Sequence, residues 1–125
     1  MQQVLIHNRT RPGGAPLHAQ SCDTFLGRLR GLMFRRAIGP REGLLMVQPS
    51  ADRLNAAIHM LFMHFDITVV WADPSLRVVD VRLAKRWRPA YMPCAAALYV
   101  LETHPDRLHD YEIGDQLAIE PCENA

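Results

Sequence analysis

Short apolar runs separated by turn residues recur along the whole chain. The run at 67–72 is β-branched and aromatic, Asp73-Pro74-Ser75 is typical of a turn, and 76–83 alternates enough to be the return strand of a hairpin. The same reasoning predicts further extended segments at 4–6, 17–22, 44–47, 56–63, 97–102 and 116–120. Short strands at such close spacing indicate a chain built mainly of β-structure.

Two short helices are expected to interrupt this pattern. Apolar residues recur at helical spacing at Phe25, Leu29, Leu32 and Met33. Asp23 is the expected N-cap of this helix, and Gly31 is expected to weaken or end it. A second helix is predicted over 105–111, with proline in its first position and Thr103 or His104 as its cap. The expected fold class is therefore mainly β (α+β), a small barrel-like or sandwich domain with one or two short helices at its rim.

Length and composition favour one compact unit. With 125 residues, of which 49% are hydrophobic and 22% charged, the chain is expected to form a single domain over 1–125. No apolar run approaches the roughly 20 residues that cross a bilayer. The first residues lack the basic and apolar parts of a signal peptide. We therefore expect a cytoplasmic protein without a membrane partner.

Charge is distributed unevenly along the chain. Residues 1–101 hold 13 of the 14 basic residues and six acids, whereas 102–125 hold Arg107 and seven acids. Arginine suits bidentate contact with carboxylate or phosphate, so the excess favours an anionic ligand. However, the acidic end could fold back on the arginines, and a pI near 7.8 is low for a nucleic-acid binder. No nucleic-acid partner is expected.

The most unusual segment is 58–66, an apolar run that carries His59 and His64 and ends at Asp66. In a regular strand His59 and Met63 share one face and His64 takes the other, so the two histidines cannot chelate one metal. An unpaired buried polar group costs about 1–3 kcal/mol. His59 therefore either lines a pocket as ligand, acid or base, or bonds a carbonyl or carboxylate inside the core.

The sequence contains no motif typical of a metal or cofactor site. The three cysteines are widely spaced without a Cys-x-x-Cys pair, which predicts neither a disulfide framework nor a zinc ribbon. The methionines are read as core gap-fillers, and neither a nucleophile elbow nor a phosphate loop is present. We expect no cofactor and no metal site.

Several short segments occur in an order that resembles a known family. They are RGLMFR at 30–35, EGLLMV at 42–47, IHMLFMHFDITVVWAD at 58–73, RVVDV at 77–81, and YVLE at 99–102 with IGDQL at 113–117. The chain is similar to the domain of unknown function 192 over about residues 23–119. The resemblance implies a compact, mostly β fold and no activity, because the family has no established biochemical role. The matching positions are Arg30, Gly31, Met33, Met63, Asp66, Glu102, Gly114 and Asp115.

Three functional hypotheses remain open. The leading one is a non-enzymatic binding or accessory module with a pocket for a small anion or acidic peptide, formed by Arg30, Met33, His59, Met63, Asp66 and Arg88. The first alternative is a hydrolase in which His59 is the base and Asp66 orients it. The second is a protein–protein interaction module, which a contiguous exposed apolar patch would favour.

Overall fold

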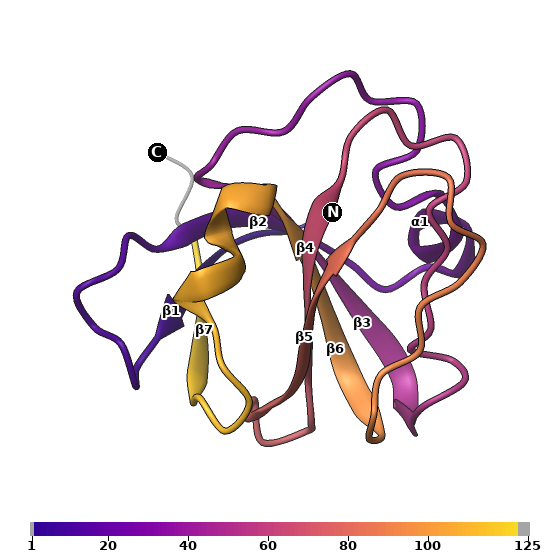
Figure 1. Ribbon diagram of the computed structural model, residues 1–125. Coiled ribbons are helices and arrows are strands. Elements are labelled where there is room, and N and C mark those ends of the chain that lie inside the picture. The colour runs from indigo at the N-terminus through magenta and orange to yellow at the C-terminus, as the bar shows by residue number, and fades with distance from the viewer. Residues whose placement is uncertain (1, 123–125) are drawn as a thin grey trace.

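The computed structural model describes residues 2–122, apart from the side chains of Phe25 and Leu29, and one seven-stranded sheet dominates this part of the chain (Figure 1). The strands are β1 (Gln2–Asn8), β2 (Leu17–Cys22), β3 (Glu42–Asp52), β4 (Ile67–Ala72), β5 (Val78–Ala84), β6 (Ala97–Thr103) and β7 (Leu117–Pro121). Their order across the sheet is β5-β4-β6-β3-β2-β1-β7. The expected mainly β class is confirmed.

The sheet curls until its two edges meet at one end. The backbone nitrogen of Val78 donates to the carbonyl of Asp115 at 2.8 Å, and that of Leu117 donates to Leu76 at 2.8 Å. Strands β2 and β3 run parallel, while the other strand pairs within residues 2–122 are antiparallel. The result is a curled half-barrel, which agrees with the barrel-like architecture expected from the sequence.

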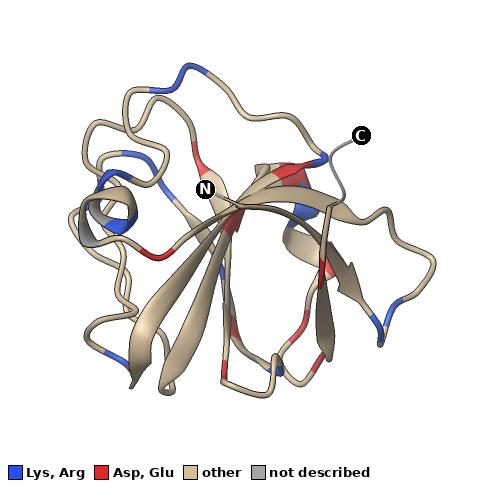
Figure 2. Cartoon of the chain, turned by 180° about the vertical axis from the view of Figure 1, so that it is seen from behind, with Lys and Arg blue, Asp and Glu red and all other residues tan. Residues whose placement is uncertain are grey.

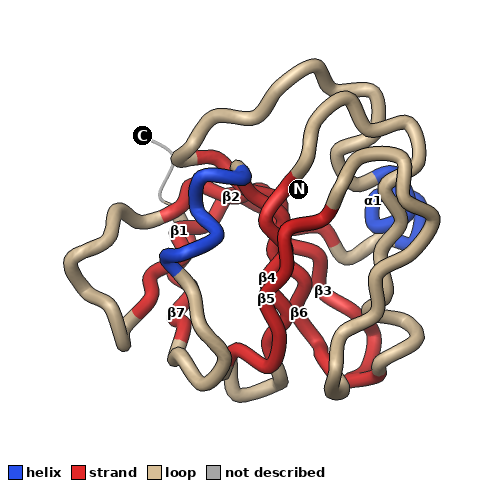
Figure 3. Tube along the Cα trace, viewed as in Figure 1, coloured by secondary structure: helices blue, strands red, loops and turns tan. Residues whose placement is uncertain are grey.

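Alternation along the central strands builds two apolar cores. Leu45, Val70 and Leu101 pack inside the curl with residues of β1, β2 and β7. Their neighbours Val69 and Val100 face the opposite side, where they form a second core with residues of the covering loops. Figure 3 shows these loops and α1 (Phe25–Arg30) beside the sheet. Because β4 is covered on both faces, all of its residues are buried, which explains its unbroken apolar sequence.

Both helices form where the sequence predicts them. Helix α1 is capped by Thr24, whose hydroxyl accepts from the backbone nitrogen of Gly27 at 3.1 Å, so Asp23 is not the cap. Gly31 ends α1 as expected. The second helix is the 3-10 helix η1 (Pro105–Asp110), capped by His104. The predicted contacts of Phe25 and Leu29 fall on side chains outside the described part of the structure.

The expectation of a strand over 56–63 is wrong. This segment is a loop, in which Ile58 forms an isolated bridge with Tyr91 and Phe62 has a φ of 60°. The positive φ breaks any extended course, so strand alternation does not decide where its side chains point. Strand β3 also extends beyond the predicted segment 44–47 and past Pro49, with a register shift between Val47 and Asp52 that accommodates the proline. Among residues 2–122, every helix is too short to cross a membrane.

Candidate functional site

A cavity of about 430 Å³ lies between α1, the 54–63 loop and the sheet. Four of the six predicted ligand-binding residues line it: Arg30, Met33, His59 and Met63. Its volume falls in the range of about 300–1,000 Å³ that is typical of small-molecule sites. The structure therefore brings together most of the predicted pocket, although by loop geometry and not by strand alternation.

The sheet contributes one carboxyl group to the cavity wall. Glu102 lies on β6 between Leu44 of β3 and Val69 of β4, and it is only 4% exposed. Within the described part of the chain, no group hydrogen-bonds to this carboxyl or forms an ion pair with it. Burial raises the pKa of Glu102 to about 7. Near neutral pH this side chain can therefore serve as a hydrogen-bond donor or as an acceptor.

The end of α1 is shaped around this carboxyl. Gly31 has a φ of 49°, which a residue with a side chain adopts only at a cost. A Cβ atom at this position would lie 3.2 Å from Oε1 of Glu102. Glycine therefore allows α1 to end directly beside the carboxyl and keeps Glu102 in contact with the cavity.

The two arginines of the cavity have different surroundings. One Nη of Arg28 donates to the carbonyls of Asp23 and Val47, which ties α1 to β3. Arg30 is exposed, and residues 2–122 offer its guanidinium no carboxylate partner. Arg30 is therefore the cation available to an anionic ligand at the cavity mouth.

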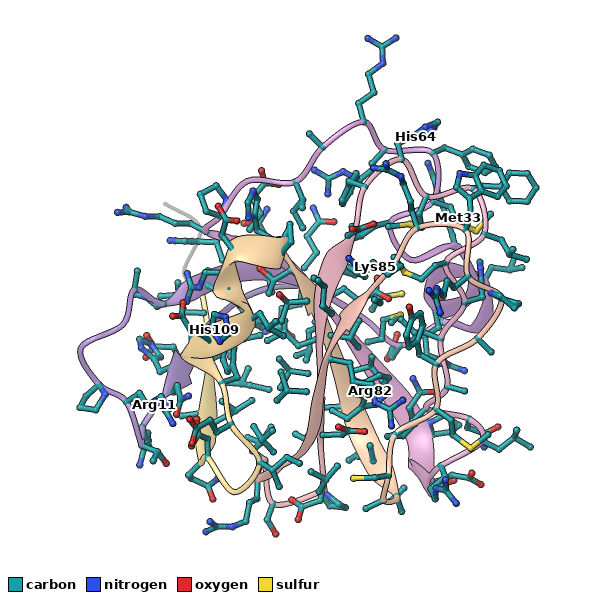
Figure 4. All side chains as sticks on the ribbon, viewed as in Figure 1. Arg11, Met33, His64, Arg82, Lys85 and His109 are labelled. Carbon is teal, nitrogen blue, oxygen red and sulfur yellow. The ribbon has the colours of Figure 1, made fainter. Side chains whose placement is uncertain are left out.

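His59 and Met33 approach the cavity from different segments. Nδ1 of His59 accepts from the backbone nitrogen of Leu61 at 3.3 Å, which helps to fix the imidazole ring. Met33 follows α1, and Figure 4 shows it on the same side of the molecule as His64 of the covering loop. With Met46 and Met63, Met33 gives the cavity a thioether-rich apolar wall.

Asp66 and Arg88 do not line this cavity. Oδ1 of Asp66 accepts from the backbone nitrogen of Arg86 at 2.9 Å, and Oδ2 lies 3.7 Å from Nζ of Lys85. The carbonyl of Arg88 accepts from the backbone nitrogen of Met60 at 3.0 Å. These contacts fasten the 58–66 loop to the 85–91 loop. The His59–Asp66 pair needed by the hydrolase hypothesis gains no support from this arrangement.

Sequence reasoning did not assign four polar lining residues to the cavity: Arg28, Gln48, Asn55 and Glu102. Glu102 stands at the end of an otherwise apolar predicted strand and within a family motif, but neither observation assigned it to a pocket. An acid in a strand that is buried on both faces is the signal that could have identified it.

Apart from Glu102, several acids of the C-terminal part of the chain pair with the first strand and the turn that follows it. Arg11, labelled in Figure 4, forms ion pairs with Glu112 at 2.7 Å and Asp115 at 3.0 Å, and His7 lies 2.9 Å from Glu120. Figure 2 shows basic positions on α1 and the covering loops and also in the turn after β1, with acidic positions in the sheet, in η1 and in several turns. Glu112, Asp115 and Glu120 therefore pair with Arg11 and His7 and not with the loop arginines.

Several known proteins are similar to this chain in sequence. The chain matches the DUF192 family, described as "Uncharacterized ACR", over residues 7–119. UPF0127 protein TK1120 of Thermococcus kodakarensis is 40% identical over 121 residues, covering 95% of this chain and 75% of that protein. A UPF0127 protein of Thermococcus gammatolerans is 43% identical over 116 residues, covering 91% of this chain and 74% of that protein.

A solved structure has a similar fold. The crystal structure of a protein of unknown function from Novosphingobium aromaticivorans superposes with a TM-score of 0.79 at 21% identity, covering 93% of this chain and 83% of that one. The resemblance inferred from the short motifs is confirmed, and the chain belongs to the DUF192 family.

Proposed function

We propose that the protein is a binding module whose cavity takes a small ligand with an anionic group. The observation that carries this proposal is the convergence of an available guanidinium, Arg30, and a buried carboxyl without a described partner, Glu102, on one cavity. The described residues give the Glu102 carboxyl no hydrogen-bond partner, so a ligand group that donates to it in place of water gains affinity.

The lining specifies the chemistry of the ligand. Arg30 suits a carboxylate or phosphate, which a guanidinium can bind through two hydrogen bonds. Met33, Met46 and Met63 suit an apolar portion, because thioether side chains adapt to irregular shapes. Glu102 suits a hydroxyl or amine that donates a hydrogen bond. The favoured ligand is therefore a small carboxylate or phosphate ester that also carries a hydrogen-bond donor.

A thermal-shift panel followed by calorimetric titration tests this proposal. The panel contains small carboxylates and phosphate esters, each with and without a hydroxyl or amine. A ligand at 100 times its dissociation constant adds about 2.7 kcal/mol, which raises the midpoint of unfolding by several degrees. Donor-bearing anions are expected to give the largest shifts.

Variants locate the binding site of any hit. Arg30→Ala is expected to weaken binding at least tenfold, and Glu102→Leu is expected to remove the preference for donor-bearing ligands, because leucine has no hydrogen-bond acceptor. Arg9→Ala is the matched control, because Arg9 is exposed in the turn after β1 and lies outside the cavity. Hits that bind all three variants equally, or a panel without hits, would show that the cavity is not an anion site.

A further inference from the structure

Three aromatic rings meet on the surface above the second core. Phe34, Phe62 and Trp87 come from three separate loops and are 59%, 46% and 53% exposed. The ring centroids of Phe34 and Phe62 are 5.4 Å apart, and those of Phe62 and Trp87 are 5.3 Å apart. We call these three residues the aromatic surface. Exposed rings in a contiguous group are uncommon unless they mark an interaction site.

The backbone at each ring is strained. Phe34, Phe62 and Trp87 have φ values of 66°, 60° and 68°, a region that bulky residues rarely adopt. Hydrogen bonds hold these conformations, from the nitrogen of Phe34 to the carbonyl of Phe62 at 3.2 Å and from the nitrogen of Trp87 to the carbonyl of Met60 at 2.7 Å. Strained backbone conformations of this kind are concentrated at functional sites. Glycine would adopt the same φ values without strain, so the fold by itself does not require an aromatic residue at any of the three positions.

The rings are flanked by arginines. Arg35 and Arg36 follow Phe34, and Arg86 and Arg88 stand on either side of Trp87. Arg35 pairs with Glu42 at 3.1 Å, whereas the described residues provide no carboxylate partner for the other three guanidinium groups. The aromatic surface therefore combines exposed apolar area with uncompensated positive charge.

We propose that the aromatic surface docks an acidic segment of a partner protein. An apolar side chain of the segment packs on the rings, and its carboxylates pair with Arg36, Arg86 and Arg88. Tryptophan, phenylalanine and arginine are enriched at protein interfaces, where lysine is depleted, and arginine forms bidentate pairs with carboxylates. A lipid surface attracts lysine and arginine alike, so the predominance of arginine favours a protein partner.

Selection from a random dodecapeptide phage library tests the proposal without a known partner. The immobilised protein is panned beside a Phe34→Ala/Phe62→Ala/Trp87→Ala variant, which is first shown to be folded by circular dichroism. Peptides rich in aspartate and glutamate with at least one large apolar residue are expected to be enriched only on the unmodified protein. Ile113→Ala is the matched control, because Ile113 is 65% exposed in the turn before β7.

Tryptophan fluorescence then measures the binding of a selected peptide. Trp71 is fully buried and Trp87 is exposed, so a change of emission on titration reports on the aromatic surface. Arg86→Glu/Arg88→Glu is expected to weaken binding at least tenfold, whereas Arg9→Glu leaves it unchanged.

Four results would overturn the proposal. The first is equal enrichment on the protein and its triple variant, or no enrichment at all. The second is binding to vesicles of phosphatidylcholine and phosphatidylglycerol that the triple variant loses, which would assign the surface to a membrane. The third is ring-dependent binding of a thymidine oligonucleotide, and the fourth is ring-dependent self-association in sedimentation velocity.

Discussion

Replacing Glu102 by glutamine should make the stability of the protein less dependent on pH. Burial raises the pKa of this carboxyl from 4.5 to about 7 in the folded protein. Between these values the folded protein holds a proton that the unfolded chain has released, so the free energy of unfolding falls by about 1.4 kcal/mol for each pH unit. The stabilisation present below pH 4.5 is thus lost as pH rises through about 7, a total of about 3 kcal/mol.

Glutamine keeps the shape of the protonated acid but does not ionise. The Glu102→Gln variant should therefore match the unmodified protein near pH 4.5 and exceed its stability by up to about 3 kcal/mol near pH 8. Urea unfolding of both proteins across this range measures the difference directly. Other titrating groups, such as Glu42 and Asp115, are present in both proteins, so their contributions cancel in the comparison.

The refuting result is a constant difference between the two proteins at every pH. Such a result would show that water or a neighbouring group solvates the carboxylate in the folded state, and that Glu102 is not a desolvated acid. A ligand that donates a hydrogen bond to Glu102 would narrow the gap at high pH, so the measurement requires protein freed of small molecules.

Three further substitutions test the local packing. Gly27→Ala should lower the urea midpoint of unfolding, because the new Cβ would lie 2.2 Å from Sγ of Cys22. This clash should outweigh the preference of about 1 kcal/mol that alanine has over glycine in a helix. Cys22→Ala in the same protein should restore part of the lost stability. Trp87→Gly removes an exposed ring but relieves a φ of 68°, so the thermal midpoint should hold or rise. Asp115→Asn should cost about 2 kcal/mol at pH 7, because Oδ2 accepts from Nδ2 of Asn8, Nε of Arg11 and the nitrogen of Glu112. Burial opposes these bonds, but together they hold the pKa of Asp115 below its usual value. The stabilisation from the ionised carboxylate is therefore lost only as pH falls below about 4. The free energies of unfolding of the two proteins, measured by chemical denaturation, should become equal below that pH.

The strands could be predicted because local pattern and tertiary role agree in them. The segments 17–22 and 67–72 were predicted with the bounds that the structure shows for β2 and β4. A buried strand needs apolar or alternating side chains whatever its neighbours are, so its signal lies within a few consecutive residues. The strand order β5-β4-β6-β3-β2-β1-β7 could not be predicted from local pattern, because strand pairing depends on contacts between residues that are distant in sequence.

The loop that carries much of the site could not be predicted in the same way. Ile58, Met60 and Met63 are buried, which matches an apolar strand in composition, but the backbone of Ile58 and Met60 bonds to the 85–91 loop and not to a strand. The four predicted residues that line the cavity follow from their chemistry and motif and not from their geometry, and their role as ligand contacts stays a prediction. The sequence does not place Glu102 in the cavity, because its contact with the cavity depends on Gly31, which lies beside it only in the folded chain.

One loop connects the two proposed binding surfaces. His59 and Met63 line the cavity, while Phe62 between them points into the aromatic surface. The carbonyl of Met60 accepts from the backbone nitrogen of Trp87, so the loop and the tryptophan are held together. We expect a ligand that packs on Met63 to restrain the backbone next to Phe62. A ligand in the cavity would then change the affinity of the aromatic surface for its partner. By the reciprocity of linked equilibria, the partner would change the affinity of the cavity for its ligand by the same factor.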